Sequence, residues 1–252
     1  GQLICILATA LFLFPLVLML IRSFKGEGLH NYVRVFETVN LAPNFLTSIT
    51  VVFGTLLIVS AVAAMAAFAF SKLDFPFKKA IYYMLLTGMM IPTSALIFPL
   101  FQIVKGLKIN NTPFSLIFPY ATLNCCFNLM VLKNYFDALP NELIEAAVMD
   151  GCKELTIYHK LVLPLVIPAL VTQGVMTFIG TWNSYLTPLI VLNDKNKFTL
   201  PLMIATVRDS THADYGAQYV GMLVSIIPMV IVFCFASRII MEKISIGAAV
   251  KG

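Results

Sequence analysis

Long uncharged apolar runs alternate with short charged segments along the chain. The six uncharged runs cover residues 1–21, 38–71, 80–104, 109–132, 161–193 and 215–237. Each run exceeds the roughly 18 apolar residues that indicate a membrane-spanning helix, whereas a β-barrel would show strands of about ten residues that alternate in polarity. We therefore predict an all-α integral membrane protein with about six spanning helices. The predicted spans lie near residues 3–21, 46–70, 80–104, 115–133, 165–191 and 216–239.

Composition agrees with this prediction, since 60% of the residues are hydrophobic and only 12% are charged, unlike the average soluble domain. We expect residues 1–252 to form a single transmembrane domain. The chain opens with Gly1-Gln2 instead of Met, so we expect an incomplete N-terminus. The first apolar run has no basic segment before it, and its A-x-A triplet lies inside the run, which favours a retained helix over a cleaved signal peptide.

Side chains that carry metal or catalytic chemistry show no suitable pattern. The five cysteines form no C-x-x-C pair and the three histidines lack H-E-x-x-H spacing, so we predict no metal site, no cofactor and no catalytic residue in this chain. The net charge of +5 fits basic residues that flank membrane spans. It does not require a nucleic-acid partner, and membrane lipid is the expected surrounding.

The source of energy for transport is expected outside the chain. The sequence contains no G-x-x-x-x-G-K-[ST] loop, which ATPases of that type use to hold phosphates. An ion-coupled secondary transporter is the alternative from a different class. Such carriers usually hold an ionisable residue within the membrane, but the predicted spans contain Asp or Glu at most at their ends. The pattern favours coupling to a partner ATPase over coupling to an ion.

A polar segment with the sequence EAAVMDGCKELTIYHKLVLP, residues 145–164, separates the fourth and fifth apolar runs. Pro140 suits a first helical turn, and Glu142 and Glu145 lie toward the positive end of that helix. We predict a short helix over 140–150.

The second half of this segment predicts a turn and another helix. Gly151 can adopt the positive φ that commonly ends a helix. A second helix is then expected over 153–162, running toward Pro164. Ala146 and Ala147 would form a low-profile docking face, with apolar contacts from Leu143, Ile144 and Val148. The alternative is a surface amphipathic helix that packs on its own bundle.

The spacing of this segment is specific: Glu145-Ala146-Ala147, three residues, Gly151, nine residues, Leu161, one residue, and Leu163-Pro164. It resembles the EAA loop of binding-protein-dependent ABC importer permeases, with Leu161 where the family usually has Ile. The resemblance implies a cytoplasmic loop that contacts a separate ATPase. The residues to which it assigns coupling are Glu145, Ala146, Ala147, Asp150, Gly151, Leu163 and Pro164.

Other short motifs extend the resemblance over nearly the whole chain. Asn31-Tyr32, Ile91-Pro92, Trp182-Asn183 and the terminal GAAVKG of residues 247–252 are similar to carbohydrate-uptake permeases typified by the smaller membrane subunit of the maltose transporter. The family implies a bacterial or archaeal plasma (inner) membrane and transport by alternating access. It also implies a second permease subunit, two ATPase subunits that hold ATP and Mg, and an extracytoplasmic sugar-binding protein. The alternative cargo is glycerol phosphate or another polar solute.

The sequence gives weaker signals for the orientation of the chain in the membrane and for the residues that contact the cargo. With the EAA loop inside, nine basic residues lie inside and eight outside, so orientation rests on the resemblance. Polar groups within apolar runs either bond neighbouring helices or line a substrate path. The candidates for that path are Asn124, Asn128, Gln173, Trp182, Asn183 and Tyr185. The polar segment 193–214 is expected to contact the binding protein or to be a solvated connector.

Overall fold

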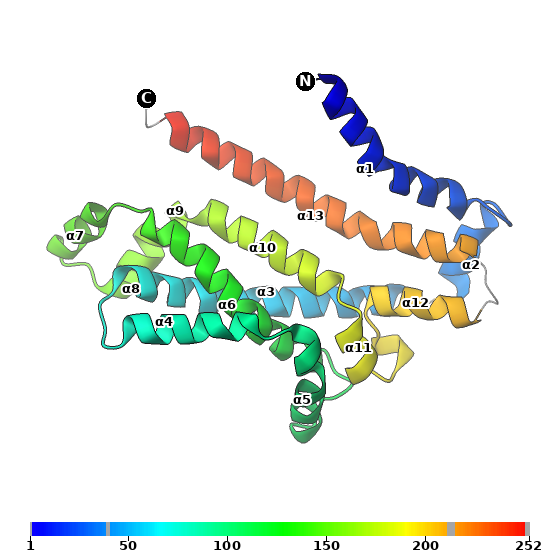
Figure 1. Ribbon diagram of the computed structural model, residues 1–252, viewed down its shortest axis with the longest axis horizontal. Coiled ribbons are helices and arrows are strands. Elements are labelled where there is room, and N and C mark those ends of the chain that lie inside the picture. The colour runs from blue at the N-terminus through cyan, green and yellow to red at the C-terminus, as the bar shows by residue number, and fades with distance from the viewer. Residues whose placement is uncertain (1, 39–40, 211–214, 250–252) are drawn as a thin grey trace. The chain divides into compact units, whose positions relative to one another are not determined.

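The computed structural model describes residues 2–38, 41–210 and 215–249, and all of the regular elements within these ranges are helices (Figure 1). The all-α fold class is confirmed. Within the described residues, four helices are long and apolar enough to cross a membrane, and two bent helix pairs raise the number to six if each pair is one span. The four are α1 (Gln2–Ser23), α3 (Leu41–Lys72), α6 (Phe114–Asp137) and α13 (Tyr215–Ala249).

The third predicted span is bent instead of straight. Helix α4 (Lys78–Thr87) continues into the 3-10 turn η1 (Gly88–Met90), and α5 (Thr93–Gly106) then leaves at 99°. Ile91 is extended, with ψ 119°, because the ring of the following Pro92 disfavours helical backbone at the residue before it. The prediction from apolarity covers this run but misses the break.

The fifth predicted span begins with a second bend. Helix α8 (Glu154–Thr156) continues through the π-helical turn η2 (Ile157–Val162) and α9 (Leu163–Leu165), and α10 (Ile167–Trp182) follows at 76°. Two prolines explain this geometry. Pro164 and Pro168 each lack the N–H that would bond to the carbonyl four residues earlier, so the helix widens into a π-turn before one and bends before the other.

The same span also ends earlier than predicted. Helix α10 stops at Trp182, and a separate short helix, α11 (Leu186–Val191), follows after three residues. The residues from 165 to 191 are continuously apolar, so their hydropathy predicts one span. Hydropathy carries no information on where the backbone changes direction within such a run.

The chain divides into two compact units: Gly1–Ile49 with Ser184–Ile231, and Thr50–Asn183 with Val232–Gly252. The prediction of a single domain stays a prediction. The second unit holds the larger core, which α3 and α6 build together with the helical segment from 154 to 182 (Figure 1). Small side chains at Ala63, Ala64 and Ala67 let the helices approach, and Phe68 lies 6.2 Å from Phe136 and 5.3 Å from Tyr158 between ring centroids.

Within the first unit, the polar segment after α11 is ordered by the start of α3. It forms the turn η3 (Lys195–Lys197) and helix α12 (Leu200–Ser210). The Asn44 side chain donates to the Lys195 carbonyl at 2.7 Å, and Ser48 Oγ accepts from the Leu200 N–H at 2.7 Å. Its first half is therefore anchored to the protein and is not a freely solvated connector. Residues 211–214, and 250–252 of the terminal motif, lie outside the described residues.

Candidate coupling segment and polar cluster

The predicted helix–turn–helix is present. Helix α7 (Asn141–Met149) follows Pro140, which is extended with ψ 135° and directs the chain into the first turn. Gly151 has φ +76°, as predicted. Its N–H donates to the Val148 carbonyl at 2.9 Å, and the Cys152 N–H donates to the Ala147 carbonyl at 3.0 Å. This pair of bonds is the Schellman arrangement that ends a helix on a left-handed residue.

Helix α7 has two apolar faces with different surroundings. Ile144 and Ala147, here called the inward face, are partly buried against the large core. Leu143, Ala146 and Met149, here called the outward face, are exposed, and Met149 keeps 87% of its surface accessible. The docking role predicted for Ala146, Ala147 and Ile144 stays a prediction, and the packing shows that Ala147 and Ile144 also contact the core whereas Ala146 is exposed. Ala146 and Ala147 are consecutive residues, so about 100° of rotation around the helix axis separates their side chains.

The remaining coupling residues are distributed along the same segment. Glu145, Asp150, Gly151 and Pro164 are exposed, whereas Leu163 is partly buried and packs against the core. The second helix does not stop before Pro164 as predicted. It runs from Glu154 through the π-turn to Leu165, so Pro164 lies inside a helical segment.

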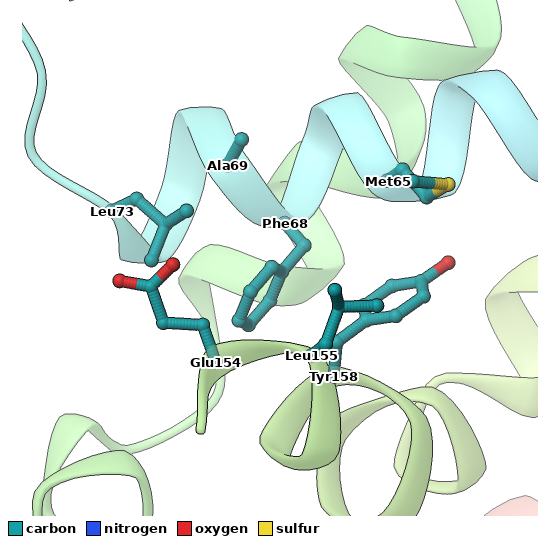
Figure 2. Close-up of a pocket in the computed structure, with 7 residues that line it drawn as sticks. All are labelled: Met65, Phe68, Ala69, Leu73, Glu154, Leu155 and Tyr158. Carbon is teal, nitrogen blue, oxygen red and sulfur yellow. The ribbon is translucent and has the colours of Figure 1, made fainter. Parts of the chain in front are cut away.

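Behind this segment lies a small apolar cavity of about 200 Å³, shown in Figure 2. Its lining comes from the C-terminal turns of α3 and from the first turns after Gly151. The Glu154 carboxylate lies near Leu73 at one end, and the Tyr158 ring lies along the other side toward Met65 (Figure 2). The junction between α3 and the second helix is therefore incompletely filled, which leaves room for side-chain rearrangement there.

Lys72 is a residue of this region that the sequence reasoning missed. Its ammonium donates to the Leu139 carbonyl at 2.7 Å and to Asn141 Oδ1 at 2.8 Å. The first bond ties the last residue of α3 to the connection that follows α6, and the second ties it to the first residue of α7. The available signal was a lone lysine directly after a long apolar run, but such lysines are ordinary span flanks.

The polar path candidates separate into buried and exposed groups. Gln173 of α10 and Asn128 of α6 are each 1% exposed. Gln173 accepts from Ser60 Oγ of α3 and donates to Thr177 Oγ1, both at 3.1 Å, and Asn128 donates to the same Thr177 oxygen at 3.1 Å. We call Ser60, Gln173, Thr177 and Asn128 the polar cluster. It joins α3, α10 and α6, which is the helix-bonding alternative for these residues.

The other four candidates differ in environment. Asn124 is partly buried and bonds back to the Tyr120 carbonyl at 2.8 Å. Trp182 is 1% exposed and stacks on Phe178 at 5.5 Å between ring centroids. Asn183 and Tyr185 are exposed, with Tyr185 at 40%. Asn128 Oδ1 and Thr181 Oγ1 are buried without a hydrogen-bond partner among the described residues. Of the six, Asn183 and Tyr185 are therefore the most exposed in this chain.

No group of three His, Cys, Asp or Glu side chains that could hold a metal ion occurs within the described part of the chain. The five cysteines are free thiols. The described helices are those of a multi-pass membrane protein, which displays a helix–turn–helix at one end of a packed helical unit.

The chain belongs to the family of binding-protein-dependent transport system inner membrane components. The family model matches residues 60–245, which include the coupling segment and the polar cluster. The protein is thus a permease component of a transport system in the inner membrane.

Individual relatives agree with this assignment. An arabinooligosaccharides transport system permease protein, AraQ of Halalkalibacterium halodurans, is 33% identical over 190 residues, covering 75% of this chain and 67% of that protein. The diacetylchitobiose uptake system permease protein NgcG of Streptomyces coelicolor is 29% identical over 258 residues, covering 96% and 85%. A chain of a bacterial ABC transporter that imports the acidic polysaccharide alginate has the same fold, with a TM-score of 0.82 at 20% identity and 94% of both chains covered.

Proposed function

We propose that the chain is the transmembrane subunit of an ATP-driven, binding-protein-dependent importer of oligosaccharides or smaller sugars. The observation that supports this cargo is similarity over nearly the whole chain to a permease named for diacetylchitobiose uptake, together with the arabinooligosaccharide relative. The described spans also suit a neutral cargo, because the polar side chains that they bury carry amides and hydroxyls, which can hydrogen-bond sugar hydroxyls.

The proposed machine contains this subunit, a second permease, two ATPase subunits that bind ATP and Mg, and a sugar-binding protein outside the membrane. The outward face of α7 contacts the ATPase on the cytoplasmic side. The inward face is fixed to the core by packing, and Lys72 ties the start of α7 to α3 through its bond to Asn141. Closure of the ATPase dimer therefore moves α7 and the helices behind it together, which alternates access from outside to inside.

The proposed coupling residues have distinct roles in this motion. Glu145, Ala146 and Asp150 belong to the exposed contact surface, while Gly151 sets the direction of the turn. Ala147 and Leu163 transmit displacement by packing, and Pro164 maintains the irregular helix beside them. On the substrate path, Asn183 and Tyr185 contact sugar directly. Asn124, Asn128, Gln173 and Trp182 hold the helices that position them.

Reconstitution tests the energy source and the cargo together. Proteoliposomes that contain the chain with its co-purifying subunits and trapped ATP should accumulate labelled arabino-, malto- or chito-oligosaccharides when the binding protein is added. Vanadate should stop accumulation, and a protonophore should leave it intact. Accumulation driven by an imposed proton or sodium gradient without ATP would instead establish an ion-coupled carrier. ATP-dependent uptake of glycerol phosphate, with no uptake of sugars, would assign the alternative cargo.

A further inference from the structure

A second cavity, separate from the one in Figure 2, lies where α3, α4 and α6 end together. Its volume is about 360 Å³. Phe70 and Ser71 come from the last turns of α3, Lys78 and Lys79 open α4, and Lys133 lies one turn before the end of α6. Neither the outward face of α7 nor the polar cluster contributes to its lining. The cavity therefore requires an explanation of its own.

The negative charge of Asp137, at the cavity wall, is already compensated within the protein. Its carboxylate accepts from Lys133 Nζ at 2.6 Å and from Ser71 Oγ at 2.6 Å. Lys133 Nζ also lies 5.2 Å from the centroid of the Tyr82 ring, a cation–π contact that holds the ammonium at the cavity. This side of the cavity is thus preorganised and nearly neutral.

The opposite side has an excess of positive charge. Lys78 donates to the Leu73 carbonyl at 2.7 Å and lies 3.5 Å from Asp74 Oδ1. The Asp74 side chain is fully exposed, so solvent screens that pair. The Lys79 side chain has no hydrogen bond or ion pair among the described residues. Two adjacent ammonium groups therefore have donors available for an anion at the cavity mouth.

The surroundings indicate which anion would bind there. The cavity lies at the end of two candidate spans and of a bent pair, where lysine and tyrosine mark the boundary between lipid and water. Tyr82 packs on Phe70 at 5.6 Å between ring centroids. Farther along α4, Ile81 and Met84 are 42% and 75% exposed. Positive charge followed by exposed apolar surface matches a phosphate headgroup followed by acyl chains, whereas a soluble anion would make no use of the apolar part.

We propose that this cavity binds the phosphate of an anionic phospholipid, with Lys78 and Lys79 as its ligands and Tyr82 as the wall against which the headgroup rests. The acyl chains extend along the exposed apolar side of α4. Binding fixes the α3–α4 connection at the membrane surface. This inference does not depend on sugar being the cargo.

Native mass spectrometry of the full chain, extracted in mild detergent with the subunits that it retains, tests the proposal. The probes are phosphatidylglycerol, phosphatidylcholine and inorganic phosphate. The test variant is K78Q/K79Q, and the matched control is K153Q/K160Q, which removes two exposed lysines outside the cavity. We expect about one phosphatidylglycerol to be retained preferentially over phosphatidylcholine, and K78Q/K79Q to weaken its retention by roughly thirtyfold. The control should bind like the parent.

Each other outcome contradicts the proposal. Unchanged phosphatidylglycerol binding by K78Q/K79Q, or an equal loss in K153Q/K160Q, would show that the lysines of the cavity are not the ligands. Equal retention of phosphatidylcholine would remove the role of charge. Displacement of the lipid by inorganic phosphate at equal concentration would assign the site to a soluble anion. A melting temperature for K78Q/K79Q that matches the control is required, so that loss of lipid is not loss of fold.

Discussion

The outward face of α7 and the polar cluster of α3, α6 and α10 each differ in polarity from the sequence around them, and they differ in opposite directions. The outward face places apolar Leu143 and Met149 in a polar segment, and both are exposed. The polar cluster places amides and hydroxyls in apolar spans, where Gln173 and Asn128 are 1% exposed and bonded to one another through Thr177. Exposed apolar groups that cluster on one face indicate contact with another protein or with the membrane. Buried polar groups that are hydrogen-bonded to one another stabilise the fold itself.

The largest expected effect separates the two faces of α7. Met149→Glu should leave membrane abundance and melting temperature near parental values, because this side chain is 87% exposed. It should weaken retention of the ATPase by about thirtyfold, the loss of an interface residue worth roughly 2 kcal/mol. Ala147→Glu should instead lower abundance, since it brings a charge against the core. Co-purification and quantitative blotting measure both effects.

Met149→Leu is the matched control and should behave like the parent. If Met149→Glu keeps its ATPase and full transport, the outward face is not the docking surface. If it destabilises the chain as much as Ala147→Glu does, the contrast between the faces fails.

The turn at Gly151 should give the next largest effect. Gly151→Val places a β-branched residue at φ +76°, which costs about 1–2 kcal/mol, although no atom lies within 4 Å of the added Cβ. Strain of that size should reorient α7 and lower ATP-dependent uptake by on the order of tenfold, with abundance maintained. Gly151→Asn should retain most uptake, because asparagine tolerates this conformation. Equal uptake by the two variants would show that the positive φ at residue 151 is not needed for coupling to the ATPase.

The polar cluster provides the third test. Gln173→Leu removes the partner of Ser60 and one partner of Thr177, and hydrogen bonds between membrane helices average about 0.6 kcal/mol each. We expect a small drop in melting temperature in detergent, with ATPase retention unchanged. A double-mutant cycle with Thr177→Val measures the shared part of this energy. Strictly additive losses would mean that the two side chains do not interact as the geometry indicates.

The smallest effect is expected at Lys72. Lys72→Met keeps the aliphatic stem and removes the two hydrogen bonds to Leu139 and Asn141, at a cost of about 1 kcal/mol. ATPase retention should persist because the outward face is untouched, and the amount of sugar transported per ATP hydrolysed should fall by less than half. Lys72→Arg should restore that ratio. If Lys72→Met transports as much sugar per ATP as the parent, the Lys72 hydrogen bonds stabilise the fold but do not contribute to coupling.

Much of this arrangement could be predicted from the sequence. Gly151 is a local signal, because the positive φ that ends a helix depends on the residue at that position. The apolar runs are local signals as well, because about 20 consecutive apolar residues are enough to indicate a membrane-spanning helix. The division of α7 into faces could not be predicted in the same way. Ile144 and Ala147 are three residues apart, as are Leu143 and Ala146, so two similar stripes compete and only tertiary packing decides between them. The break after Trp182 likewise lies within uninterrupted apolarity, whereas the break at Ile91 has a local signal in Pro92 that the apolar pattern alone does not report.

The bond between Lys72 and the Leu139 carbonyl also has a consequence for the membrane topology that we infer for this half of the chain. It joins the last residue of α3 to the connection directly after α6, and each of these helices is long enough to cross a bilayer. Two crossings that end on the same side must run in the same direction, so the chain from residue 73 to 113 has to return across the membrane. The bent pair α4–α5 therefore counts as one complete crossing. An impermeant thiol reagent should reach the exposed Cys152 and a cysteine introduced at Asp74 from the same face of the membrane.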